Sequence, residues 1–139
     1  MKMRNVLLPV LGVLAAPLAF VAANAAEDFA GKVRAEIQSV TEVHPGMQKG
    51  MYVCASNHLH VTGTVQNLAD VTLGKIKMGG KAFDLNGNLL GTATSSTKKV
   101  LLPPDDKAEF NLEFLTVTGT TIDQVKRQEV SVLEAPPLR

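Results

Sequence analysis

The amino-acid sequence predicts an all-β protein, an antiparallel β-sandwich of about seven strands preceded by an N-terminal signal peptide. Apolar and polar residues alternate with a period of two in one segment after another. Turn-forming residues separate these segments at intervals of roughly 8 to 20 residues. No long helical pattern links any two of them, so antiparallel pairing is the expected arrangement.

Composition limits the chain to one domain and argues against a nucleic-acid partner. The chain has 139 residues, of which 19% are charged, and a formal net charge of +1. No cluster of basic residues offers an electrostatic footprint for phosphates. The single cysteine, Cys54, cannot form a disulfide framework within one chain. We expect Cys54 to be a buried free thiol, with intermolecular pairing as the alternative.

Residues 1–25 are typical of a secretory signal peptide. Lys2 and Arg4 form a basic start, an apolar stretch follows, and Ala23-Asn24-Ala25 fits the small-residue cleavage pattern. The alternative is an uncleaved membrane anchor, which is the one way in which the chain would contact a membrane. We therefore predict a periplasmic or secreted protein with a signal peptide at 1–25, a sandwich domain at 26–135 and a tail at 136–139.

The first strands follow directly from the alternation. Val33, Ala35 and Ile37 share one face of an expected strand, which His44-Pro45-Gly46 interrupts. The clearest pattern follows at residues 58–66, where one face is apolar and the other polar. We expect the apolar face to be buried and the polar face to be wet. The apolar face carries Leu59, Val61, Gly63 and Val65, and the polar face His58, His60, Thr62, Thr64 and Gln66.

A longer run at 71–85 predicts the next strand, with Ile76, Met78 and Ala82 facing inward. Gly79-Gly80 in its middle indicates a bulge or a close backbone approach. Asn86-Gly87 is the dipeptide best suited to a type I′ turn, which predicts a hairpin returning through residues 88–94.

The last third of the chain supplies two more strands. Pro103-Pro104-Asp105-Asp106 predicts a turn. A strand follows in which every second residue is apolar, then a threonine-rich connection and a final strand from about residue 124 to 133. The predicted core of the sandwich is Leu59, Val61, Val65, Ile76, Phe83, Leu101, Phe110, Leu112 and Phe114.

The order of motifs between residues 61 and 114 resembles the FxLYD family of exported bacterial immunoglobulin-like domains. The resemblance implies an immunoglobulin-like sandwich that serves as a binding or assembly module. The chain departs from the family at the Pro103-Pro104-Asp105-Asp106 turn, where a P-G-E/D type of turn is usual. The matching positions are Gly63, Asn67, Phe83, Asp84, Gly87, Pro103 and Phe110, together with Val61, Val65, Leu101 and Ala108.

Three of these residues also have a physical explanation that does not depend on the family. Gly63, inside a strand, allows a neighbouring group to approach closely. The Asn67 side chain suits a turn at the end of a strand, because it can mimic a backbone turn. Asp84 can accept hydrogen bonds from backbone N–H groups across the hairpin.

The alternative function is periplasmic binding of copper or zinc. His58 and His60 lie two residues apart on one strand, so both side chains point to the same face. The segment from His44 to His60 also holds Met47, Met51 and Cys54, and such soft ligands suit copper. The competing interpretation is that the histidines occupy the polar face of a strand and the methionines pack under a loop, and no cofactor is then needed.

No catalytic motif is present in the sequence. The serines lack the sequence context that places a nucleophile beside a base, and the adjacent carboxylates of Asp105 and Asp106 are typical of a turn. Lys75, Lys77 and Lys81 are typical of strands protected against aggregation. We therefore predict a non-enzymatic module for protein–protein interaction or envelope assembly, with a protein partner and no small-molecule substrate.

Overall fold

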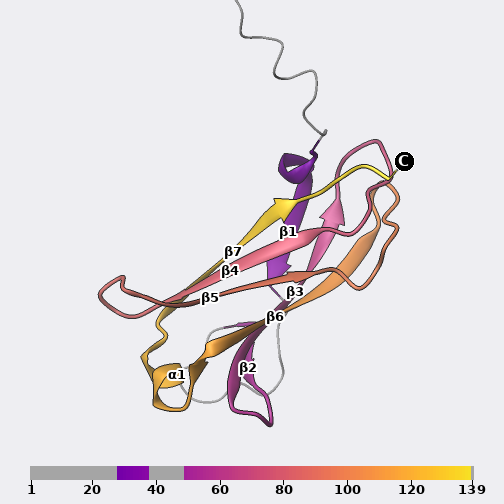
Figure 1. The fold of residues 1–139 in the computed structure, drawn as a ribbon. Coiled ribbons are helices and arrows are strands. Elements are labelled where there is room, and N and C mark those ends of the chain that lie inside the picture. The colour runs from indigo at the N-terminus through magenta and orange to yellow at the C-terminus, as the bar shows by residue number, and fades with distance from the viewer. Residues whose placement is uncertain (1–27, 38–48, 139) are drawn as a thin grey trace, which may run out of the picture.

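The computed structural model describes residues 28–37 and 49–138, which form seven strands, one short α-helix and one 3-10 turn (Figure 1). The predicted break at His44-Pro45-Gly46 lies outside these residues. No helix in the described ranges is long and apolar enough to cross a bilayer. The elements are η2 (Ala30–Lys32), β1 (Val33–Ile37), β2 (Met51–Val53), β3 (His58–Asn67), β4 (Lys77–Phe83), β5 (Leu89–Ser96), β6 (Lys107–Thr118), α1 (Thr120–Gln124) and β7 (Arg127–Glu134).

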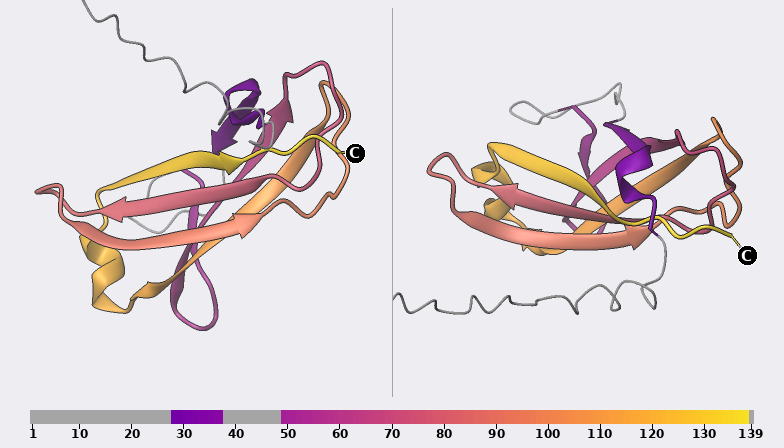
Figure 2. Two further views of the ribbon diagram at one scale, coloured as in Figure 1. Left: turned by 45° about the horizontal axis from the view of Figure 1, so that its top comes forward. Right: turned by 90° about the horizontal axis from the view of Figure 1, so that it is seen from above.

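The strands form two antiparallel sheets that face each other as two layers (Figure 2). In the first sheet, β3 pairs with β6 along one edge, while β1 and β2 share its other edge end to end. In the second sheet, the order is β5-β4-β7. The predicted all-β antiparallel sandwich of about seven strands is therefore confirmed.

The core lies between the sheets and is formed mainly by inward-facing residues of β3, β4 and β6, with further residues from β2 and the loops. The alternation predicted for β6 is confirmed, because Phe110, Leu112 and Phe114 are buried. The prediction for Leu101 is wrong: Leu101 is 50% exposed, and its neighbour Leu102 is buried instead. Leu102 hydrogen-bonds through its backbone to Leu73, which turns its side chain into the core.

Phe83 is half-buried at the end of β4 and packs less deeply than predicted. Its ring lies under the guanidinium of Arg127, with 4.1 Å from the Arg127 Cζ to the ring centroid. A cation above an aromatic face is attracted by the ring quadrupole. The prediction that Phe83 belongs to the core is therefore wrong.

Three glycines allow parts of the sandwich to approach closely. The sequence predicts a close approach for two of them, Gly63 and Gly80. A Cβ at Gly80 would stand 2.9 Å from side-chain atoms of Leu112 and Phe114 in the opposite sheet. A Cβ at Gly63 would stand 2.2 Å from the backbone oxygen of Glu36. Gly91 brings β5 equally close to β6, so the two sheets join along that side of the sandwich.

The β4–β5 hairpin is present, but the predicted type I′ turn is wrong. Gly87 has a positive φ of 84°, whereas Asn86 is not among the residues with positive φ. The N–H of Gly87 donates to the backbone oxygen of Asp84 at 3.1 Å, which closes a four-residue turn that ends at Gly87. The Asp84 carboxylate explains this choice, because it accepts hydrogen bonds from the backbone N–H groups of Asn86 and Asn88, at 2.9 Å each.

Asn67 ends β3 and holds two loops together from a fully buried position. Its side-chain nitrogen donates to the backbone oxygens of Val71 and Leu102, at 2.9 Å each. Its side-chain oxygen accepts a hydrogen bond from the N–H of Ala69 at 2.8 Å. The predicted turn role of Asn67 is confirmed, and the bond to Leu102 adds a link to a distant loop.

The chain differs from the prediction most between β6 and the C-terminus. The short helix α1 occupies part of the threonine-rich connection, and β7 begins later than predicted, at Arg127. Residues 136–138, predicted as a tail, pair with residues 72–74: the Gly74 N–H donates to the Pro136 oxygen, and the Leu138 N–H to the Thr72 oxygen. Periodicity does not reveal such contacts, because they depend on loops that lie far apart in the sequence.

Candidate functional site

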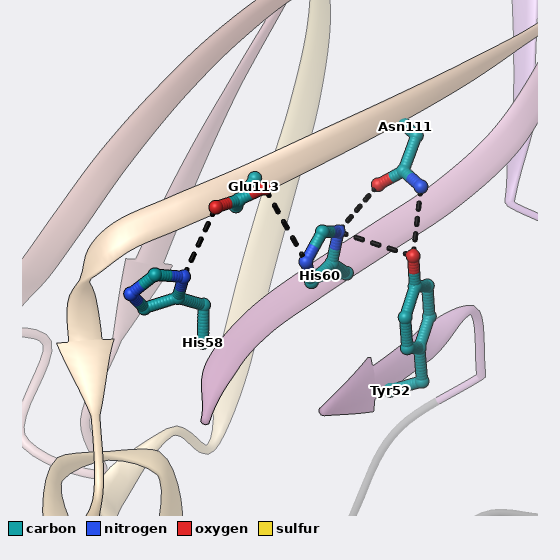
Figure 3. Close-up of polar contacts among 5 residues, drawn as sticks. All are labelled: Tyr52, His58, His60, Asn111 and Glu113. Atoms are coloured by element: carbon teal, nitrogen blue, oxygen red, sulfur yellow. Dashed lines mark hydrogen bonds and ion pairs between the residues drawn. The ribbon is translucent and has the colours of Figure 1, made fainter. Parts of the chain in front are cut away.

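A cluster of polar side chains lies on the outer face of the first sheet, where β2, β3 and β6 run side by side (Figure 3). The strand register builds it: His60 of β3 stands opposite Tyr52 of β2 on one side and opposite Glu113 of β6 on the other. Asn111 precedes Glu113 by two residues and shares its face. His58 completes the cluster at the start of β3.

His60 is 7% exposed, which contradicts the prediction that its face would be wet. The Tyr52 ring stacks on the imidazole, with ring centroids 4.6 Å apart and an interplanar angle of 17°. The imidazole Nδ1 lies 2.7 Å from the Asn111 Oδ1 and 3.1 Å from the Tyr52 hydroxyl. The neighbouring strands therefore cover this histidine on its outer side.

These contacts determine which imidazole nitrogen of His60 carries a proton. The side-chain nitrogen of Asn111 donates to the Tyr52 hydroxyl at 2.8 Å, so its side-chain oxygen faces His60. An amide oxygen can only accept, so the His60 Nδ1 is the donor. In the neutral ring the lone pair is then on Nε2.

Glu113 lies between the two histidines and contacts both (Figure 3). One carboxylate oxygen is 3.0 Å from the His58 Nδ1, which is a hydrogen-bond distance. The other is 3.6 Å from the His60 Nε2, and this nitrogen is buried without a hydrogen-bond partner. The Glu113 carboxylate therefore lies beside a buried imidazole nitrogen that makes no hydrogen bond.

The structure separates the ligands predicted for a metal site. His58 and His60 do share one face, as predicted. Met51 is 1% exposed and packs in the core, on the opposite side of the sheet from His60. Cys54 is half-buried, and its N–H donates to the His58 oxygen at 3.1 Å across the β2–β3 turn. Met47 and His44 lie outside the described residues.

No three His, Cys, Asp or Glu side chains in the described ranges form a ready metal centre. Sequence reasoning also missed three members of the cluster, Tyr52, Asn111 and Glu113. A signal for two of them was present, because Asn111 and Glu113 occupy the outward positions of their strand. Recognising it required knowing that this strand is the neighbour of the one with the histidines.

A second feature is the open side of the sandwich, opposite the side that Gly91 closes. β7 pairs with β4 along one edge, and no described strand pairs with its other edge. Across the gap between layers, β7 contacts β1, which is also an edge strand. The inward apolar residues of these two strands are only half-buried; they are Val33, Ala35 and Ile37 of β1, and Val130 and Val132 of β7.

A shallow hollow of about 380 Å³ lies beside the start of β6, and Lys98, Lys99 and Lys107 line it. Lys99 pairs with Asp106, with 3.0 Å between Nζ and Oδ2. The hydrogen bond from Lys99 lowers the pKa of Asp106, helped by the backbone N–H of Lys107. One of the three lysine charges that line this hollow is therefore paired within the chain.

No family model and no curated protein matches the chain. Among solved structures, the chain is similar to a DUF1425 family member from Shewanella sp. pv-4, with 15% sequence identity and a TM-score of 0.44. The similarity covers 74% of this chain and 78% of the other. The resemblance to FxLYD domains stays a prediction.

Proposed function

We propose that the chain is an exported, non-enzymatic module that binds a protein partner by adding a strand to β7. The observation that carries this proposal is the open edge of the β5-β4-β7 sheet. An edge strand leaves backbone N–H and C=O groups available, and an extended segment of a partner can pair with them. Such pairing would extend the sheet to four strands.

The side chains beside this edge suit an apolar partner. Val130 and Val132 face the open side of the sandwich and are half-buried, so an added strand would cover them. Charged residues stand at both ends of β7, at Arg127 and Glu134, while the stretch from Val130 to Leu133 has none. The partner segment is therefore an extended strand whose alternate residues are apolar.

The test uses two lysine substitutions at adjacent positions of β7. The purified protein is the bait in an envelope extract of its source organism. Val130→Lys puts a charge on the side that the partner strand would cover, and it abolishes partner capture, because an inward charge blocks edge pairing. Ser131→Lys adds the same charge on the exposed outer face and leaves capture unchanged.

Hydrogen exchange on the captured complex provides the second readout. Strand addition slows exchange of the β7 amides that do not bond to β4. Recovery of no partner, equal capture by both lysine variants, or unchanged exchange in β7 each contradicts the proposal. Melting temperatures of both variants show whether a loss of capture comes from unfolding.

A further inference from the structure

The cluster around His60 contains a buried polar atom that the fold leaves without a hydrogen bond. The His60 Nε2 has no hydrogen-bond partner, although the residue is 7% exposed. A buried imidazole nitrogen that lacks a partner costs free energy relative to one that is bonded. The Glu113 Oε2, which is also an acceptor, lies 3.6 Å from this nitrogen.

We propose that this pair of atoms binds a divalent transition-metal ion of the zinc or copper type. With neutral His60, two acceptors face each other, and a cation bound to both would stabilise this arrangement. The 3.6 Å between the His60 Nε2 and the Glu113 Oε2 is longer than an N–H···O hydrogen bond. Two ligands of a tetrahedral zinc ion, each about 2.0 to 2.1 Å from the metal, lie about 3.3 Å apart.

The surroundings of the two ligand atoms fit this role. Asn111 accepts the Nδ1 proton of His60, and a histidine that binds a metal usually donates its other ring N–H in this way. His58 hydrogen-bonds to the second oxygen of Glu113 and so orients the carboxylate. Imidazole nitrogen together with carboxylate oxygen suits zinc and copper(II) better than calcium or magnesium.

This ligand set differs from the one that the sequence indicates. Glu113 takes the place of the sulfur ligands, because Met51 lies on the other side of the sheet. The described residues supply two ligand atoms, and water fills the remaining positions. The Glu113 side chain is 44% exposed, so an ion reaches the pair from the solvent side of this carboxylate.

The experiment is calorimetric titration of the purified protein with zinc chloride and, separately, with a copper(II) salt. The wild-type protein binds one ion, and His60→Gln and Glu113→Gln each abolish binding. Glu109→Gln is the matched control, because Glu109 is exposed on the same face of β6, opposite Thr64 and away from the histidines. His58→Gln weakens binding by about tenfold while the melting temperature stays unchanged, as expected of a positioning residue.

Nuclear magnetic resonance of nitrogen-15-labelled histidine rings identifies the ligand atom. Zinc shifts the His60 Nε2 signal more than any other ring nitrogen. Absence of binding in the wild-type protein, undiminished binding in the Glu113→Gln variant, or loss of binding through His44→Gln alone each overturns the proposal. If His60→Gln fails to fold, Glu113→Gln decides the result, since Glu113 is exposed.

Discussion

Asn67 and Gly63 show how single residues set the packing of the first sheet. Asn67 is fully buried and makes three hydrogen bonds with its side chain. Gly63 lies opposite Phe110 in the strand register, and the Phe110 ring occupies the space where a Cβ would stand. Asn67 connects loops, and Gly63 leaves room for the Phe110 ring.

Replacing Asn67 with alanine is expected to lower the free energy of unfolding by about 2 to 4 kcal/mol. The substitution leaves the buried backbone oxygen of Leu102 and the partly buried one of Val71 without the side-chain donor. Chemical denaturation measures the change. Asn86→Ala, at an exposed turn position, is the control and changes stability little; an equal loss in both variants would contradict the buried role of Asn67.

Gly63→Ala is expected to cost about 1 to 3 kcal/mol, because the added methyl group collides with groups that cannot move away cheaply. The new Cβ would stand 2.2 Å from the Glu36 backbone oxygen and 2.6 Å from the Phe110 Cζ. Gly31→Ala is the matched control, since nothing lies within 4 Å of a Cβ there. Similar melting temperatures for the two alanine variants would show that the sheet adapts at Gly63.

Residue-level predictions from the sequence succeeded where periodicity alone decides burial. Leu59, Val61 and Val65 are buried as predicted. His60 is also buried, against the prediction, because the Tyr52 ring of β2 covers it. The alternation of residues within β3 does not reveal which strand lies beside it. The Val100-Leu101-Leu102 run is apolar at every position, so the sequence contained no alternation to choose Leu102 over Leu101.

At the scale of elements, the β4–β5 hairpin shows a side chain overriding a dipeptide preference. Asn86-Gly87 favours a type I′ turn, yet Asp84 binds the N–H groups of Asn86 and Asn88. The Asn88 side chain also donates to the Asp84 carboxylate. This bond first, and then the backbone bonds, lower the pKa of Asp84 from its usual value of 3.8. The hairpin itself was predictable, but its turn type depended on competition between neighbouring residues.

The lowered pKa of Asp84 predicts a pH-dependent contribution to stability. The carboxylate stabilises the folded state at pH values above 3.8, and the contribution is lost as the pH falls through the still lower folded-state pKa. Asp84→Asn therefore lowers the melting temperature near neutral pH, and the difference from wild type shrinks in acid. Thermal melts across the pH range measure this; Asp70→Asn, at an exposed loop position, is the control.

For the whole molecule, the first described residues are tied to the end of the last strand. The Phe29 N–H donates to the Ala135 oxygen, and the Asp28 carboxylate accepts from the Ala135 N–H, at 3.0 Å each. The predicted cleavage after Ala25 would leave these contacts intact. The described sandwich would therefore keep this N-terminal tie if residues 1–25 are removed as predicted.

Export predicts a defined N-terminus for the mature protein. The chain isolated from the envelope or the medium begins at Ala26, because signal peptidase cleaves after the small-residue pattern that ends at Ala25. Intact-mass measurement and N-terminal sequencing check this. Ala25→Tyr, which destroys the pattern, retains the full-length mass; a wild-type protein that keeps Lys2 and Arg4 contradicts the prediction.

The close approach of β5 to β6 at Gly91 packs the two sheets tightly together along one side of the sandwich. A Cβ at this glycine would stand 2.7 Å from atoms of Thr116 and Val117, so the two sheets cannot separate there without breaking dense packing. We therefore expect local opening of the native state to begin on the opposite side of the sandwich, between β1 and β7. The same motion that loosens the fold would present Val130 and Val132 to an incoming strand.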